Sequence, residues 1–321
     1  MSILCTGSII ANMVINVAFC FDHNLIRQVQ VAVASLLDHT RAEQTHYHIY
    51  CVCTREAMAV EEKLRRIVES RDGESILTVK ALNNPFQNAY EVRGISTGTY
   101  LRLGLPGLLP DVDRILYTDV DILFRGSLEE LWQTPMEGKF LAAVRGGANL
   151  SDQWEMNSRR PYWHHLERMR GNYINAGVTL MNLAEIRAQG LESRWREWTK
   201  EKLYYQDQDI LNITCQGKIA YLPLKYNCLA YMTAEDYDKC MREGVHTAQE
   251  CEEARHNPVI IHYAGDKPWK RYDTNLGKIW WEYVNSSADL CGLFDEAAAR
   301  RNHGPTLWER GIRKVQKMLK K

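Results

Sequence analysis

Two aspartates, Asp119 and Asp121, are the residues of this sequence whose type and spacing indicate chemistry most directly. They follow an apolar run within RILYTDVDILF, residues 114–124, which has the composition of a β-strand. Side chains two residues apart in a strand lie on the same face, with Cα atoms about 6.6 Å apart. Two carboxylates beside an apolar core repel each other unless a cation compensates, and oxygen ligands suit Mg2+ or Mn2+. The spacing therefore indicates a divalent cation with open positions for phosphate oxygens.

Two other interpretations start from the same pair. If the strand ends at Thr118, both aspartates are turn residues in water, because short Asp-x-Asp matches are common. Phosphoryl transfer of the haloacid-dehalogenase type also uses an Asp after a strand, near the start of its domain, with Thr or Val two positions after the second Asp. Leu123 occupies that position here, and the motif lies more than a hundred residues into the chain. We therefore disfavour the phosphoryl-transfer interpretation.

The elements that must position this pair alternate along the first 265 residues or so. Strands are predicted at residues 15–21, 47–53, 76–82, 114–124, 139–144, 175–183 and 259–262, and helices at residues 24–37 and 55–69. Strands separated by helices of this length predict βαβ crossovers and a mostly parallel α/β sheet covered on both faces. Ligands of such sheets bind at the carboxyl ends of the strands.

Composition excludes several classes of protein. The chain has 321 residues, of which 45% are hydrophobic and 25% charged, so a disordered or fibrous chain is excluded. The 40 Lys and Arg balance the 40 Asp and Glu, so the overall positive field of a non-specific nucleic-acid binder is missing. The nine cysteines have no CxxC pair and no zinc-type spacing, which is typical of reduced, cytosolic thiols. We expect neither a signal peptide nor a membrane-spanning helix.

Six segments carry a family resemblance. They are CFDHN at residues 20–24, YLRL at 100–103, ILYTDVDILF at 115–124, INAGVTLMNL at 174–183, YQDQDILN at 205–212 and HYAGDKPW at 262–269. In this order they resemble glycosyltransferase family 8, retaining enzymes that include bacterial lipopolysaccharide galactosyl- and glucosyltransferases and glycogenin. The resemblance covers about residues 18–269. It implies a GT-A fold, which is a Rossmann-like nucleotide-binding domain around a mixed, mostly parallel sheet.

The resemblance also implies roles for single residues. Asp119, Asp121 and His262 would bind Mn2+ or Mg2+, which bridges the diphosphate of a UDP-sugar donor. Gln208, Asp207 and Asp121 are the implied catalytic residues, with Gln208 acting either as a weak nucleophile or as a dipole beside the anomeric carbon. The implied donor-binding residues are Cys20, Phe21, Asp22, Asn24, Arg102, Asp119, Val120, Asn175, Gly177, Gly265 and Lys267.

Taken singly, most of these residues also have a structural interpretation. Asp22 and Asn24 suit the cap of the helix that begins near residue 25, and His262 follows an apolar run as a core histidine would. The order of the six segments favours the functional interpretation. One departure matters: a single residue separates Gly265 from Lys267, where bacterial relatives often have two. We therefore expect a tighter loop there.

The C-terminal residues 308–321, WERGIRKVQKMLKK, predict an amphipathic helix with six Lys or Arg and one Glu on its polar face. Such a helix suits an anionic membrane surface, and it equally suits packing of its apolar face on the domain. We predict a GT-A catalytic domain at residues 1–265 and a C-terminal helical extension at residues 266–321 that associates with membrane.

Together these observations predict a metal-dependent, retaining hexosyltransferase. It would transfer galactose or glucose from a UDP-sugar to a saccharide acceptor of a lipopolysaccharide or other surface glycan, forming an α-linkage at the cytoplasmic face of a membrane. The acceptor is expected to be lipid-linked, and no nucleic-acid partner is expected. Two alternatives stay open: a glycogenin-like self-glucosylating protein, and a non-catalytic sugar-nucleotide or glycan-binding protein. The sequence leaves the sugar, the acceptor, the linkage position and the oligomeric state undetermined.

Overall fold

The computed structural model describes residues 13–39, 45–82, 86, 88–92 and 97–302. Its main feature is a seven-stranded sheet with the order β3-β2-β1-β4-β7-β6-β8. These strands are β1 (Met13–Phe21), β2 (Thr45–Cys53), β3 (Ile76–Ala81), β4 (Arg114–Thr118), β6 (Leu141–Arg145), β7 (Ile174–Asn182) and β8 (Ile219–Tyr221). Strand β7 pairs antiparallel with β4 and β6, while the other pairings in this sheet are parallel. The predicted mixed, mostly parallel sheet is confirmed.

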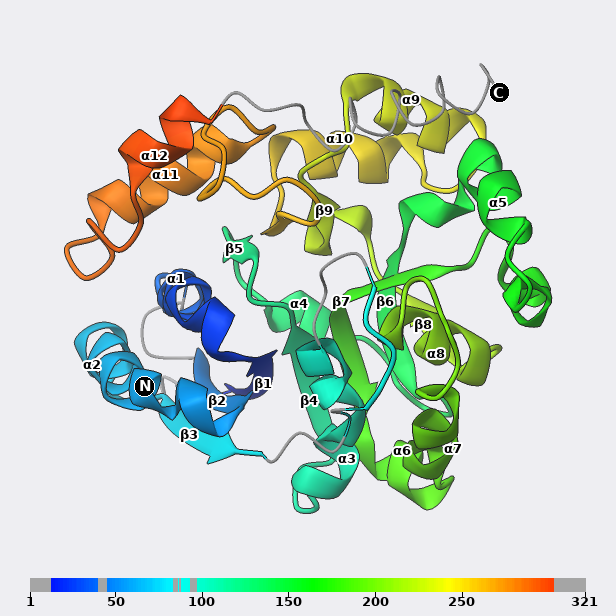
Figure 1. Ribbon diagram of the computed structural model, residues 1–321, viewed down its shortest axis with the longest axis horizontal. Helices are drawn as coiled ribbons and strands as arrows, with labels where there is room; N and C mark the ends of the chain where they lie inside the picture. Colours follow the sequence, from blue (N-terminus) through cyan, green and yellow to red (C-terminus); the bar gives the residue numbers. More distant parts are fainter. Residues whose placement is uncertain (1–12, 40–44, 83–85, 87, 93–96, 303–321) are drawn as a thin grey trace, which may run out of the picture.

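Both faces of this sheet are buried, which is why its strands are nearly continuous apolar runs. Along β1, Ile15, Val17 and Phe19 belong to one apolar core, while Ala18 and Cys20 belong to a second core on the opposite face. Helices cover both faces (Figure 1). The first core includes residues of α1 (Ile26–Leu37), α2 (Glu61–Arg71), α4 (Glu129–Trp132), α9 (Ala234–Arg242), α10 (Ala248–His256), α11 (Gly277–Ser286) and α12 (Glu296–Arg301). The second core includes residues of α3 (Leu105–Leu108), α5 (Ser151–Ser158), α6 (Leu183–Ala188), α7 (Leu191–Trp198) and α8 (Asp207–Thr214).

The prediction of one strand over residues 114–124 is wrong in one respect that matters for the site. The chain leaves the large sheet after Thr118, and β5 (Ile122–Phe124) enters a second sheet with β10 (Ile260–His262) and β9 (Cys228–Leu229). The backbone N–H of Asp119 donates to Gly177 O on β7 (2.8 Å), and Tyr263 N–H donates to Asp121 O (2.8 Å). The two aspartates therefore lie where the chain crosses between sheets, because β4 and β5 have different pairing partners.

The residues after the predicted domain boundary at 265 pack on the same core as the sheet. Trp280 and Trp281 on α11 are buried, and the ring of Trp280 lies 5.4 Å from that of Tyr263, centroid to centroid. At the end of α2, Arg71 Nη1 lies 2.6 Å from Asp289 Oδ2 in the segment that follows α11. Residues 303–321, and with them the predicted basic helix, lie outside the described residues.

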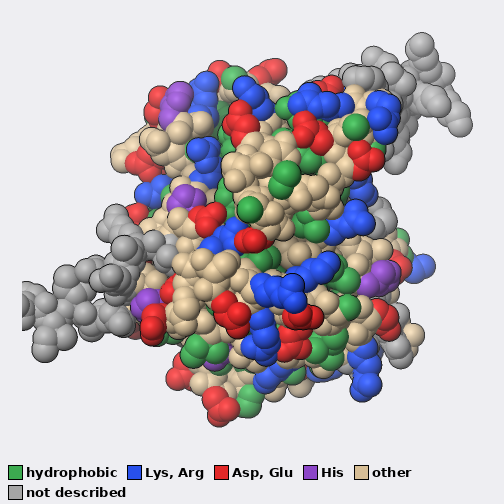
Figure 2. Space-filling view, turned by 90° about the vertical axis from the view of Figure 1, so that its left-hand side faces the viewer, with side chains coloured by type: hydrophobic (Ala, Val, Ile, Leu, Met, Phe, Trp, Pro, Cys, Tyr) green, Lys and Arg blue, Asp and Glu red, His purple; other side chains and the backbone are tan. Residues whose placement is uncertain are grey.

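The surface agrees with the balanced charge of the sequence. On the face seen in Figure 2, basic and acidic side chains of the described residues are interspersed rather than gathered by sign. Within the described ranges, we find no helix with the length and apolar character required to cross a membrane.

Candidate active site

The site forms where strands of opposite direction meet. Strands β1 and β4 are parallel, so their carboxyl ends lie at one edge of the sheet. Strand β7 runs the other way, and its register pairs Thr118 with Val178. Its first residues, among them Asn175 and Gly177, therefore lie beside the aspartates that follow β4. Strand β10 brings His262 to the same place, because His262 pairs with Ile122 just after Asp121.

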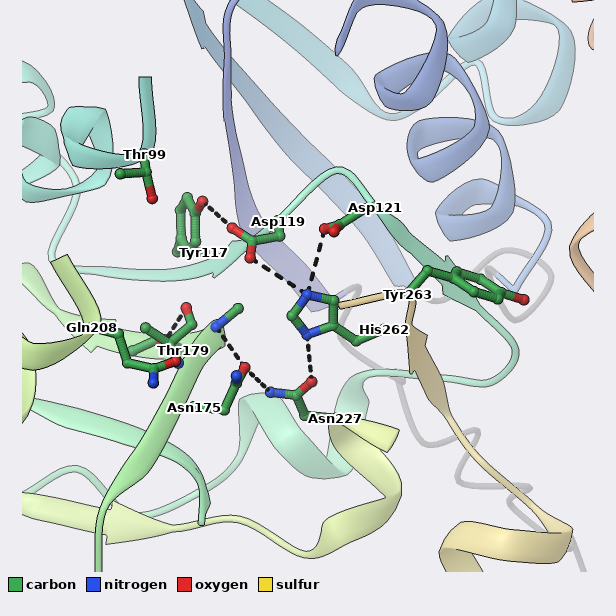
Figure 3. A network of polar contacts seen from close by, with 12 residues as sticks. Thr99, Tyr117, Asp119, Asp121, Asn175, Thr179, Gln208, Asn227, His262 and Tyr263 are labelled. Atoms are coloured by element: carbon green, nitrogen blue, oxygen red, sulfur yellow. Dashed lines mark hydrogen bonds and ion pairs between the residues drawn. The ribbon is translucent and has the colours of Figure 1, made fainter. Parts of the chain in front are cut away.

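Asp119, Asp121 and His262 form one cluster of candidate metal ligands (Figure 3). One ligand atom from each residue lies within 4.8 Å of the other two. Nε2 of His262 is 3.5 Å from Asp119 Oδ2 and 3.4 Å from Asp121 Oδ1. The side chains of Asp119 and Asp121 are 26% and 17% exposed, so the interpretation as turn residues in water is wrong, although the strand does end at Thr118. Two carboxylates and one imidazole nitrogen at this spacing fit a divalent cation.

Gly177 provides the space for this cluster. A Cβ atom at this position would lie 2.2 Å from His262 Cε1, 2.7 Å from His262 Nδ1 and 2.9 Å from Asp119 Oδ2. No side chain tolerates contacts this short with a ring and a carboxylate. A glycine is therefore required for the imidazole and the carboxylate to approach the backbone of β7.

Arg102 holds two carboxylates rather than facing solvent. It lies on a 3-10 helix, Thr97–Gly104, and its guanidinium contacts Asp119 Oδ1 (2.7 Å) and Asp207 Oδ2 (2.9 Å) above the ring of Tyr117. The hydroxyl of Tyr117 also donates to Asp119 Oδ1 (2.6 Å). With Oδ1 held in this way, Asp119 presents Oδ2 to His262. Arg102 itself is almost fully buried, so it acts on the site by orienting these acids.

Lys267 neutralises the other acid of the pair. Its Nζ forms a close ion pair with Asp121 Oδ2 and donates to Tyr263 O at 2.7 Å. Gly265 adopts a φ of 95° in the loop between β10 and Lys267, a conformation that favours glycine. Burial alone would raise the pKa of Asp121, but Lys267 and His262 together hold that pKa well below its usual range. Asp121 is therefore an anion available to a cation.

Gln208 and Asp207 begin helix α8 beside β7. Gln208 Oε1 accepts from the backbone N–H of Ala176 (3.1 Å), and its Nε2 donates to the hydroxyl of Tyr173 (3.0 Å). Burial raises the pKa of Asp207 to about 6, although Arg102 and Thr99 act in the opposite direction. Buried groups with shifted pKa values of this kind cluster at functional sites.

The end of β1 carries the other predicted donor residues. The side chains of Cys20, Phe21 and Val120 are buried, so contacts of these residues with a donor would involve backbone atoms. The carboxylate of Asp22 accepts from the backbone N–H of Asn24 (2.9 Å) and caps the turn that precedes α1, as the structural interpretation expects. Asn24 is exposed at the same edge of the sheet.

Sequence reasoning missed several residues that hold the site. Asn227, from the loop before β9, hydrogen-bonds both His262 (3.0 Å) and Asn175 (2.8 Å). Asp209 accepts a hydrogen bond from the hydroxyl of Tyr173 (2.6 Å), and this hydroxyl in turn accepts from Gln208. A lone Asn in a loop has no pattern that marks it. The position of Tyr117 beside the site could have been predicted, because side chains two residues apart in a strand lie on the same face and Tyr117 precedes Asp119 by two.

The solved structures that share this doubly covered α/β sheet are glycosyltransferases, so the fold is the GT-A fold. Residues 16–273 match the model of glycosyl transferase family 8. The chain therefore belongs to glycosyltransferase family 8, and the resemblance of its six segments is confirmed.

Several relatives of this chain are named as bacterial glycosyltransferases. It is 25% identical to a putative glycosyltransferase of Haemophilus influenzae, over 81% of this chain and 74% of the relative. It is 26% identical to a lipopolysaccharide 1,2-glucosyltransferase of Escherichia coli, over 79% of this chain and 73% of the relative. Among solved structures, galactosyltransferase LgtC, in complex with donor and acceptor sugar analogs, has a TM-score of 0.66 and 27% identity, covering 85% of this chain and 96% of that one. The apo structure of the bifunctional glycosyltransferase WbbM shares the fold, with a TM-score of 0.69 and 19% identity over 94% of this chain and 51% of that chain.

Proposed function

We propose that this chain is a metal-dependent, retaining glycosyltransferase that uses a UDP-sugar as donor. It transfers galactose or glucose in α-linkage to a saccharide acceptor of a lipopolysaccharide or another surface glycan. The observation that carries this proposal is the cluster of Asp119, Asp121 and His262 at the crossing between the sheets. The names of the relatives, a lipopolysaccharide glucosyltransferase and a galactosyltransferase, support the substrate class.

In this proposal, the charges of the site would assist cleavage of the donor. Asp119 Oδ2, Asp121 Oδ1 and His262 Nε2 would hold the cation, which supplies positive charge where the leaving diphosphate becomes more negative. Lys267 adds a second positive charge beside Asp121. Arg102 keeps Asp119 and Asp207 in fixed orientations, so that little reorganisation is needed during the reaction.

Retention of configuration follows from which face of the sugar reacts. In the proposed reaction the acceptor hydroxyl approaches the face that the leaving phosphate vacates, and that phosphate accepts its proton. An acid and base pair at glycosidase spacing is then unnecessary. The side-chain amide of Gln208 is hydrogen-bonded by Ala176 and Tyr173 and lies beside the strand that carries Asn175. In this proposal, Gln208 stabilises the positive charge that develops on the anomeric carbon, either as a weak nucleophile or as a dipole. Asn175, Asp207 and Gln208 are the proposed contacts of the donor sugar.

Thermal unfolding with a panel of UDP-sugars tests this proposal. We expect UDP-galactose or UDP-glucose with Mn2+ to raise Tm on the order of 5 °C at about 100 times Kd, since such binding contributes about 2.7 kcal/mol. EDTA should cancel the shift. The same donor should release UDP slowly to water, which a non-catalytic binding protein would not do. A panel in which no UDP-sugar raises Tm in the presence of Mn2+ would contradict the proposal.

We also propose that residues 1–265 form the catalytic domain and residues 266–321 an extension that brings the enzyme to a lipid-linked acceptor at the cytoplasmic face of a membrane. The basic composition of residues 308–321 supports this part of the proposal. Deleting residues 308–321 should release the protein from vesicles containing phosphatidylglycerol, while turnover of a soluble acceptor is retained. Vesicles of phosphatidylcholine alone are the control. Equal sedimentation of the full-length and truncated proteins with the anionic vesicles would refute the membrane role.

A further inference from the structure

The amide of Asn227 lies between a proposed metal ligand and a proposed sugar-binding residue (Figure 3). Its side chain is buried, with the residue 1% exposed. Its Oδ1 lies 3.0 Å from Nδ1 of His262, and its Nδ2 donates to Oδ1 of Asn175 at 2.8 Å. No proposed contact with substrate needs Asn227 itself, so its amide is available to orient the two residues beside it.

The hydrogen bonds around Asn227 determine which way its amide points. Asn175 Oδ1 also accepts from the backbone N–H of Gly177 (3.0 Å), and a backbone N–H can only donate. The Asn175 atom in this position is therefore oxygen, and Asn227 must present its NH2 group to it. The oxygen of Asn227 then faces His262 Nδ1.

This orientation determines which ring nitrogen of His262 carries the hydrogen. An amide oxygen can only accept, so Nδ1 of His262 must carry a hydrogen. In the neutral ring the other nitrogen, Nε2, then has a lone pair, and it faces Asp119 Oδ2 at 3.5 Å and Asp121 Oδ1 at 3.4 Å. A lone pair aimed at two carboxylates is unfavourable unless a cation lies between them. The backbone N–H of Gly177 thus directs the lone pair of His262 through two side-chain amides.

We propose that Asn227 is a positioning residue that sets the His262 tautomer for metal binding and, with the same amide, orients Asn175 toward the donor sugar. This inference rests on the proposed function, because it assumes that the three clustered residues bind a cation. Metal ligands of the histidine type depend on such partners, whose loss costs about 10–100-fold in metal affinity. Asn227 also links the two halves of the donor site, the diphosphate side and the sugar side.

Two substitutions separate these effects. Asn227→Ala removes both hydrogen bonds and should weaken Mn2+ binding about 10–100-fold in calorimetric titrations. Asn227→Asp keeps an oxygen for His262 Nδ1 but places its second oxygen against Asn175. It should therefore hold Mn2+ within about threefold of wild type and lower the affinity for UDP-galactose or UDP-glucose, relative to UDP, about tenfold. Asn182→Ala is the matched control, because this amide also bonds two groups, Glu185 N–H and Met136 O, but lies at the end of β7 that pairs with Arg114, away from the site.

The outcomes separate failure of the inference from failure of the proposed function. Wild-type protein that binds no Mn2+ would overturn both. Wild-type protein that binds Mn2+, together with a folded Asn227→Ala variant of unchanged affinity, would overturn the inference alone. If that variant does not fold, 15N chemical shifts of His262 in wild-type protein saturated with Mg2+ decide, with His262→Ala providing the assignment. A hydrogen on Nδ1 is expected, and a hydrogen on Nε2 would overturn the inference.

Discussion

Replacing Asp121 by Asn is expected to reduce sugar transfer about 10³-fold or more, with the fold retained. The neutral amide is a poor ligand for a hard cation, and it leaves Lys267 without the anion that holds it in place. Mn2+ affinity should fall together with the initial rate of UDP release. The free energy of unfolding should fall by no more than about 2 kcal/mol, because the substitution keeps the shape of the side chain and removes an ion pair with a partly exposed lysine.

Asp152→Asn is the matched control for this substitution. Asp152 also pairs with a lysine, since its Oδ1 lies 2.5 Å from Lys239 Nζ, but it lies on α5, outside the candidate active site. We expect wild-type rates and wild-type Mn2+ affinity for this variant. Full activity of Asp121→Asn in the presence of EDTA would show that the reaction does not use a cation held by this residue.

Replacing Gly177 by Ala is expected to produce the second-largest loss, about 100-fold or more in both Mn2+ affinity and transfer rate. The added Cβ would lie 2.2 Å from His262 Cε1, so either the ring or the strand must move. Strand β7 is held by its pairing with β4 and β6, and Gly177 O accepts from Asp119 N–H. His262 should therefore be displaced from the carboxylates, at a cost in stability of about 1–3 kcal/mol.

Gly73→Ala controls for the general effect of removing a glycine. A Cβ atom added at Gly73 would have nothing within 4 Å, and the φ of this residue lies outside the left-handed region. Thermal melts of both variants would separate loss of stability from loss of metal binding. A Gly177→Ala protein that titrates with Mn2+ like wild type would show that the close approach of His262 to β7 is not needed for the site.

Six of the seven strands of the large sheet were predictable because their signal is local, whereas the three-residue strand β8 was not predicted. The apolar runs around Ile15 and Val178 are buried on both faces, and such runs are visible in any short window of sequence. Asp119 and Asp121 were recognisable as candidates for the same reason, since both follow an apolar run, although the Asp-x-Asp spacing alone is common. His262 and Gln208 were assigned only through the family resemblance, because neither residue lies in a pattern that requires it to be functional.

The break between β4 and β5 shows where local signals fail. Residues 114–124 have the pattern of one strand, and only the pairing of Ile122–Phe124 with a strand some 140 positions later turns the chain out of the large sheet. Val120 between the two acids is buried, as a strand residue would be, so its type does not reveal the crossing. The choice between one strand and two is made by the partner strand.

The amino-acid sequence by itself determined the α/β class, the family and the acids that can hold a cation, because composition and short-range periodicity encode the class and the order of six short segments encodes the family. Only the tertiary structure decided what each of these side chains touches. Arg102 is buried against Asp119 and Asp207, Lys267 reaches Asp121, and Asn227 joins His262 to Asn175. Most of these partners are far apart in sequence, so their contacts depend on how the sheets pack and carry no local pattern.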